Sequence, residues 1–170
     1  MEKQLKSPSE ALAITKRYWN DVPVRVFDLA AELGLGPWRT ILPDNISGKI
    51  VRMPDRSWGI QYNARHAVVR QRFTVAHEIG HFIFHRALLA NGVSDTLAYR
   101  ADDVDCPNPA IGREQEWQAN NFAANLLIPD RWLKAARTAG FREVADLAQR
   151  FEVSQTAMRI KLRLPLPTEQ

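Results

Sequence analysis

Two histidines and a glutamate lie close enough together in this sequence to share one metal ion. His77, Glu78 and His81 form the pattern His-Glu-x-x-His. On an α-helix of about 3.6 residues per turn, the two histidines project in directions roughly 40° apart, so both imidazoles can bind one Zn²⁺. Glu78 lies about 100° round from His77, beside the metal, where a carboxylate can act as general base on a water molecule. The pattern therefore predicts a catalytic zinc site.

The surrounding residues support a helix and a buried site. Apolar residues recur at three- and four-residue steps over 69–89, which predicts a helix. Two histidines and a glutamate without partners would be costly inside such an apolar helix, so a metal is favoured over core histidines that satisfy one another. Gly80 in mid-helix costs about 1 kcal/mol relative to alanine, which indicates a close approach to another element.

A catalytic zinc uses three protein ligands and keeps one position open. His85 lies two turns from His77, about 12 Å along the axis, so we expect it to be structural or to support a ligand. Glu116, on a second predicted helix over 113–127, is the better third ligand. Asn120 shares its face and can accept the outer N–H of a ligating histidine. Glu114 lies about 200° away from Glu116. The alternatives are a solvated Glu116 and ligation by Asp102, Asp103 or Cys106.

The group that stabilises the transition state of a hydrolysis cannot be assigned from the pattern. Four side chains are candidates, each against an ordinary surface or turn role: Tyr62, His66, Tyr99 and Arg113.

Two blocks carry a family resemblance. Phe73–His81 reads F-T-x-A-H-E-x-G-H, and Glu116–Pro129 reads E-x-x-A-N-x-F-A-x-x-L-L-x-P. Together they resemble the ImmA/IrrE family of bacterial metallo-endopeptidases, and the resemblance extends over about residues 21–164. It implies a gluzincin-type zinc peptidase with one Zn²⁺ per chain, ligands His77, His81 and Glu116, and Glu78 as base. It also implies a partner class, because family members cleave helix-turn-helix repressors of phage, mobile elements or stress responses.

The elements that position these residues predict an α+β fold. Helices are expected over 9–19, with Ser9 as a possible N-cap, and over 27–34, 69–89, 113–127, 131–138, 143–150 and 154–162. A hairpin is expected over 48–63, and 90–112 reads as a long connection. A short sheet should pack on the zinc helix in a small zincin-like domain, and strand 59–63 could pair with an extended substrate. We expect one domain over 1–170: a helix in 1–20, a core in 21–130 and a helical tail in 131–164.

The tail resembles a helix-turn-helix. A second helix capped by Ser154 would carry Gln155, Arg159, Lys161 and Arg163. Glu152 stands where such a turn usually has glycine, and the apolar residues of this segment are needed for packing. Packing or docking of a protein substrate is therefore favoured over direct DNA binding. The alternative functions are a DNA-binding regulator and a zinc-bearing interaction module, although such a module need not have kept Glu78.

Composition limits the remaining function classes. The 170 residues include 23 Lys and Arg against 19 Asp and Glu, a formal charge of +4 that suits an acidic partner. The single cysteine, Cys106, excludes an intrachain disulfide and a four-cysteine zinc site. No run reaches the roughly 18 apolar residues of a membrane span. These features predict a cytoplasmic protein that does not enter a membrane.

Overall fold

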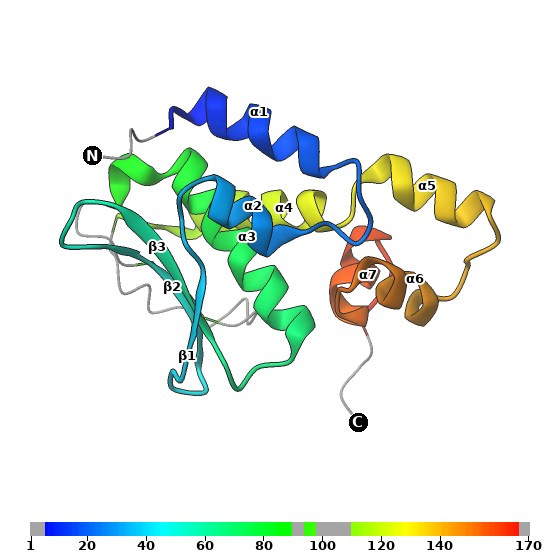
Figure 1. Cartoon of the computed structure of the whole chain (residues 1–170). Helices are drawn as coiled ribbons and strands as arrows, with labels where there is room; N and C mark the ends of the chain where they lie inside the picture. The colour runs from blue at the N-terminus through cyan, green and yellow to red at the C-terminus, as the bar shows by residue number, and fades with distance from the viewer. Residues whose placement is uncertain (1–5, 90–93, 98–109, 167–170) are drawn as a thin grey trace.

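The computed structural model describes residues 6–89, 94–97 and 110–166. Within these residues the chain forms an α+β fold, as predicted, in which seven α-helices and one 3-10 helix accompany four strands (Figure 1). In chain order they are α1 (Pro8–Tyr18), α2 (Val26–Glu32), β1 (Trp38–Thr40), β2 (Ile46–Arg52), β3 (Trp58–Asn63), α3 (Val68–Phe84), η1 (Arg86–Leu88), β4 (Ser94–Leu97), α4 (Arg113–Leu127), α5 (Asp130–Thr138), α6 (Val144–Phe151) and α7 (Gln155–Lys161).

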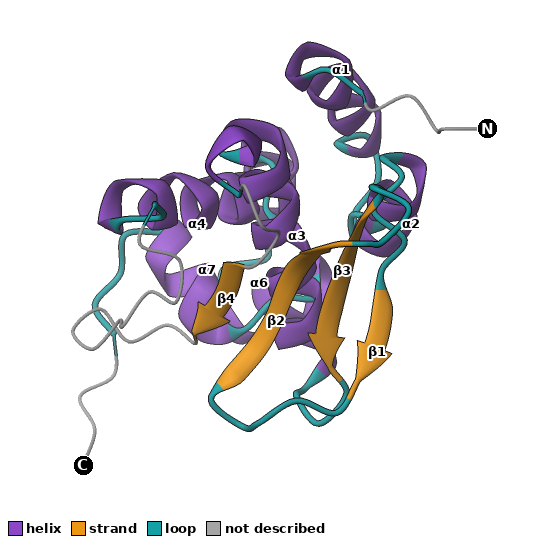
Figure 2. Cartoon of the chain, turned by 90° about the vertical axis from the view of Figure 1, so that its left-hand side faces the viewer, coloured by secondary structure: helices purple, strands orange, loops and turns teal. Residues whose placement is uncertain are grey.

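The four strands form one sheet in the order β1-β3-β2-β4 (Figure 2). β2 and β3 are the predicted antiparallel hairpin, with Ile50 opposite Ile60. β1 runs parallel to β3 on its other side. Because β3 has a strand on each side, its backbone groups are already used, and the expectation that residues 59–63 pair with a substrate is wrong. The two outer strands of the described sheet are β1 and β4.

The segment between the two sequence blocks is not entirely irregular. Residues 90–112 were expected to be a connection, yet Ser94–Leu97 forms β4 and pairs antiparallel with β2, with Ser94 opposite Ile50. The pairing contains an irregularity between Ile46 and Lys49. β4 is only four residues long and joins a partner far away in sequence, so local periodicity carries little sign of it.

One face of the sheet packs directly on α3. Ile50 and Ile60 are fully buried on the strands. A Cβ built on Gly48 would lie 2.4 Å from Thr74 Cγ2 of α3 and 2.5 Å from the carbonyl oxygen of Gln61. No side chain fits at this position, so glycine lets the sheet approach the helix closely.

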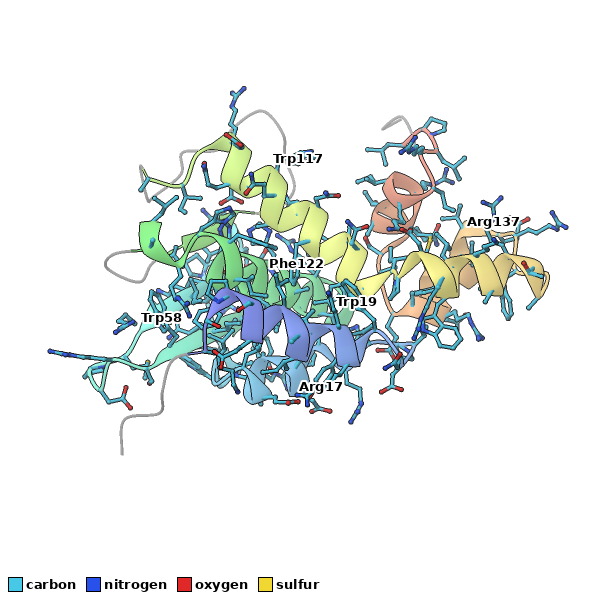
Figure 3. All side chains as sticks on the ribbon, turned by 90° about the horizontal axis from the view of Figure 1, so that it is seen from above. Arg17, Trp19, Trp58, Trp117, Phe122 and Arg137 are labelled. Carbon is cyan, nitrogen blue, oxygen red and sulfur yellow. The ribbon has the colours of Figure 1, made fainter. Side chains whose placement is uncertain are left out.

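α4 lies against α3, and Gly80 is the point of close approach. A Cβ at Gly80 would stand 3.1 Å from Phe122 Cδ1 and 3.2 Å from the Cα of Ala119. Figure 3 shows Phe122 on α4, close to the centre of the molecule. The close approach expected from a glycine in mid-helix is therefore confirmed. It holds the helix that carries the two histidines near the helix that carries Glu116.

The N-terminal helix begins slightly earlier than expected. α1 starts at Pro8, and its N-cap is Ser7 rather than Ser9. The Ser7 hydroxyl accepts a hydrogen bond from the Glu10 amide, while the Glu10 carboxylate accepts one from the Ser7 amide. This reciprocal capping pair is the signal that fixes the first turn.

The helices α5, α6 and α7 lie beyond the C-terminal end of α4 (Figure 1). Arg72, 5% exposed, joins them to the sheet-bearing part. Its guanidinium donates to the carbonyl oxygens of Val24 at 2.9 Å and Glu152 at 3.1 Å, and it pairs with the Glu152 carboxylate at 3.2 Å. Glu152 itself has a left-handed backbone with φ of 50°, which forms the turn between α6 and α7. In the described part of the chain, no helix is both long and apolar enough to cross a membrane.

Candidate metal centre

Three side chains from α3 and α4 converge on one point. One ligand atom from each of His77, His81 and Glu116 lies within 4.8 Å of the others. The two Nε2 atoms are 2.9 Å apart. The Glu116 carboxylate places Oε2 3.2 Å from His77 Nε2 and Oε1 3.3 Å from His81 Nε2. Two imidazole nitrogens and a carboxylate oxygen form a group that could hold a metal ion.

Local structure explains why the three side chains meet. His77 and His81 are one turn apart on α3, so both rings face the same side. Both are buried, whereas Glu116 keeps 23% of its side chain exposed. Glu116 lies in the first turn of α4, where the close approach at Gly80 brings the two helices together. The cluster is thus open to solvent mainly on the side of Glu116.

The outer nitrogen of His77 has a polar partner. His77 Nδ1 lies 2.8 Å from Asn120 Oδ1. An amide oxygen only accepts, so Nδ1 carries a proton, and in the neutral ring that binds a metal Nε2 keeps its lone pair. Asn120 is one turn after Glu116 on the same face of α4, the position from which a role in fixing the His77 tautomer is predicted.

His85 lies behind His81, away from the three ligand atoms. Its Nδ1 is 3.0 Å from His81 Nδ1, and its Nε2 is 2.9 Å from Gln118 Oε1. His85 is thus in contact with a predicted ligand and is not one of the three converging groups. The motif does not single out Gln118. Its sequence signal is weak, because it is a single glutamine four residues after Glu114. In the structure the Gln118 amide nitrogen donates to the Glu114 carboxylate at 3.3 Å.

The charges of the cluster support one another. Burial opposes a charged His77, but the hydrogen bond that the charged ring donates to the Glu116 carboxylate, together with the negative charges of Glu78 and Glu116, outweighs it and raises the pKa of His77. Burial would raise the pKa of Glu116, yet its bonds to His77 and His81 hold that pKa well below its usual range. Glu116 is therefore a carboxylate at neutral pH, the form that binds a cation.

Glu78 lies next to the cluster. Its side chain is fully buried on α3, directly after His77. Its negative charge is one of the causes that raise the pKa of His77. A buried carboxylate that follows one potential ligand in sequence, and is not itself one of the three converging groups, is suited to proton transfer.

The candidate transition-state stabilisers lie among other contacts. The Tyr62 ring packs against Phe27 of α2 at 5.3 Å, and burial raises the pKa of its hydroxyl. His66 Nε2 is 3.1 Å from the carbonyl oxygen of Asp44. Arg113 is the exposed first residue of α4. These contacts of Tyr62 and His66 do not involve His77, His81 or Glu116. The other candidates, Tyr99 and the alternative ligands Asp102, Asp103 and Cys106, lie outside the described residues.

Comparison with known families agrees with this geometry. Residues 42–163 match the IrrE N-terminal-like domain, a family of peptidases. The chain belongs to this family. The matched segment includes both α3 and α4, so the resemblance read from the two sequence blocks is confirmed, together with a small zincin-like α+β fold.

The fold also recurs in a solved structure. A Mycobacterium tuberculosis transcriptional regulator is similar, with a TM-score of 0.62 and 17% sequence identity. The similarity covers 91% of this chain and 46% of that chain, so this chain spans less than half the length of the regulator. At such identity the similarity shows a shared fold. None of the curated proteins matches this sequence.

Proposed function

We propose that this chain is a zinc-dependent endopeptidase with one Zn²⁺ held by His77, His81 and Glu116. The observation that carries the proposal is the convergence of their ligand atoms within 4.8 Å of one another. Two imidazoles and one carboxylate are the donor set of many hydrolytic zinc sites, which leave a fourth position open. Membership of a peptidase family supports the same reaction.

The buried carboxylate beside this group is the proposed base. When bound, Zn²⁺ supplies a Lewis acid that makes water more acidic and polarises a peptide carbonyl. Glu78 takes a proton from the attacking water and passes it to the leaving amine. Asn120 holds the His77 ring with its Nε2 lone pair toward the cluster.

The outer edge of β4 is the proposed place for the peptide. β4 pairs with β2 on one side, and within the described sheet no strand lies on its other side. A peptide added there would be extended, with its backbone bonded to the edge and its side chains alternating in direction. A helical segment of a substrate would therefore have to unwind before cleavage.

The proposed substrate is a helix-turn-helix transcriptional repressor of a phage, a mobile element or a stress response. The family resemblance supplies this partner class, and the solved structure of similar fold is itself called a transcriptional regulator. Cutting a repressor between its DNA-binding and dimerisation parts removes the avidity of two half-sites. The net charge of +4 would assist encounter with an acidic partner. Such a substrate and the single cysteine both fit a cytoplasmic location.

We further propose that the tail packs as part of one domain and does not read DNA. Lys161 Nζ bonds Asn125 Oδ1 at 2.6 Å and Asp130 Oδ1 at 2.8 Å, and its side chain is only 11% exposed. Arg159 donates to the carbonyl oxygen of Pro165 at 3.3 Å. Both cations of α7 thus have partners inside the chain. A gel shift at low and high salt tests this, since phosphate contacts give binding that falls steeply with salt.

A cleavage assay tests the substrate class. The zinc-loaded protein is incubated separately with casein and with the repressor encoded beside this gene. We expect one discrete cut in the repressor and little digestion of casein. Efficient casein digestion without a discrete repressor cut would refute the regulatory role and leave the zinc chemistry standing.

A further inference from the structure

The two predicted histidine ligands are held in different ways. His77 contacts Asn120 directly through Nδ1. His81 instead contacts His85, and His85 contacts Gln118 of α4. We propose that His85 and Gln118 are positioning residues, which fix the proton of His81 on Nδ1 and so leave its Nε2 lone pair for the metal. This inference rests on the proposed metal site and adds two residues to it.

The proton of each hydrogen bond between α4 and His81 can be assigned in turn, beginning at Glu114 of α4. The Glu114 carboxylate can only accept, so the Gln118 amide nitrogen, 3.3 Å away, donates to it. That contact turns Gln118 Oε1 toward His85 Nε2, 2.9 Å away. An amide oxygen cannot donate, so the proton of this bond belongs to His85 Nε2.

A neutral imidazole has one N–H and one lone pair, so a proton on His85 Nε2 leaves Nδ1 as an acceptor. The atom that faces it, 3.0 Å away, is His81 Nδ1. His81 must therefore donate from Nδ1, and in the neutral ring that binds a metal its Nε2 carries the lone pair. That lone pair faces His77 Nε2 at 2.9 Å. Two lone pairs so close repel each other unless a cation lies between them. Two facing lone pairs are therefore the arrangement that a metal site requires.

The positions of Asn120 and Gln118 on α4 explain why the two histidine rings are held by different residues. Residues 116 and 118 project about 200° apart round a helix, on opposite flanks of the contact with α3. Glu116 and Asn120 occupy the flank of the ligand atoms. Gln118 occupies the other flank, which the outer nitrogen of His81 faces through His85. One helix thus holds both ring orientations.

A pair of variants at His85 separates positioning from packing. The His85 ring centroid also lies 6.2 Å from that of Phe84, so the alternative role for His85 is apolar packing alone. His85→Phe keeps a ring and removes both nitrogens, whereas His85→Asn loses the ring and keeps an oxygen where Nδ1 stood. We expect His85→Phe to weaken Zn²⁺ binding about 10–100-fold and His85→Asn to recover most of it. Tighter Zn²⁺ binding by His85→Phe than by His85→Asn would overturn the proposal and show that the ring serves in packing.

Gln118 offers a second test nearer the surface. Gln118→Leu removes the acceptor and should weaken Zn²⁺ binding several-fold, whereas Gln118→Glu should retain it. Asn121→Ala, at an exposed position of α4, is the matched control and should change nothing. Zn²⁺ affinity is measured by competition with a chromophoric chelator, and thermal unfolding of the metal-free variants shows whether each one folds. Equal affinity for Gln118→Leu and the wild type would overturn the role of Gln118.

Nitrogen NMR of the zinc-loaded wild type gives a readout independent of both affinity and activity. We expect the His85 proton on Nε2 and none on Nδ1; a proton on Nδ1 would overturn the proposal even if His85→Phe failed to fold. Failure of the positioning role can be distinguished from failure of the proposed peptidase function. A wild type that binds zinc but cuts no peptide leaves the positioning role intact, whereas a wild type that binds no zinc overturns both.

Discussion

His77 and His81 each turn one ring nitrogen toward Glu116 and the other toward a partner inside the protein. Glu78 lies beside them, fully buried. The roles proposed for these residues differ in kind, because a ligand holds the metal while a base moves a proton. Substitutions can therefore separate metal binding from turnover.

Glu78→Gln should keep the fold and Zn²⁺ binding and abolish cleavage. The amide has nearly the shape of the carboxylate but cannot accept a proton from water. Zinc content is measured by metal analysis, and turnover with the repressor substrate. Near-normal turnover in this variant would contradict the assignment of Glu78 as base.

Glu116→Ala should lose Zn²⁺ or bind it far more weakly, because it removes one of three proposed ligands. Asn120→Ala should weaken binding by about 10–100-fold, since it frees the His77 ring to turn or change tautomer. Asn121→Ala, at an exposed position of the same helix, is the control and should leave the affinity unchanged. Chelator competition measures all three. Normal affinity in Glu116→Ala, together with loss in Asp103→Ala, would show that the third ligand is elsewhere.

α3 and α4 are the elements that the site needs, and Gly80 sets how closely they approach. The nearest atoms to a Cβ there belong to Phe122 and to the backbone of Ala119, which cannot move away like a flexible side chain. The distance between the helices is therefore coupled to the distance between the histidines and Glu116. Figure 3 places Trp117, the residue after Glu116, on the outside of α4, where it is 65% exposed.

Gly80→Leu should weaken both stability and metal binding. A leucine must push the helices apart, which overpacks the contact and costs about 1–3 kcal/mol in the free energy of unfolding. The same displacement should draw Glu116 away from the two rings and lower Zn²⁺ affinity. Asn121→Leu places the same side chain at an exposed position of α4 and should change neither. Urea unfolding and chelator competition measure the two effects. A stable Gly80→Leu protein with unchanged affinity would show that the spacing of the helices does not control the site.

Over the whole molecule, contacts between distant parts of the chain join the tail to the sheet-bearing part. Arg72 reaches both Val24 and Glu152. The Trp132 indole donates to the carbonyl oxygen of Trp19 at 2.9 Å. Buried residues of α6 and α7, among them Phe151 and Met158, belong to the same apolar cluster as those of α3. These contacts support one cooperative unit.

Arg72→Ala should lower the free energy of unfolding by about 2–4 kcal/mol, because two carbonyl oxygens lose a charged donor. Glu152→Gln is the control. It removes only the ion pair to a half-exposed carboxylate, which is worth less than about 1 kcal/mol. Urea unfolding followed by tryptophan fluorescence and by circular dichroism should give one coincident transition in the wild type. Two separate transitions would show that the tail unfolds independently.

The sequence by itself determined the features that depend on short-range spacing. The pair His77 and His81 requires only the repeat of one helix, and α4 runs over Arg113–Leu127, the range that periodicity predicts. The hairpin of β2 and β3 likewise follows from two alternating segments around a turn. Each of these signals lies within one element or between neighbours.

Only the tertiary structure decided which elements meet. β1 and β4 are short strands whose partners supply their stability, so alternation within them predicts little. The pairing of β1 places β3 inside the sheet, contrary to the expectation for residues 59–63, and the pairing of β4 makes β4 one of the two outer strands of the described sheet. The contact of His85 with Gln118 joins two helices, and helix periodicity cannot state how one helix is rotated against another. The approach at Gly80 sets that rotation, and with it the partner of each ring.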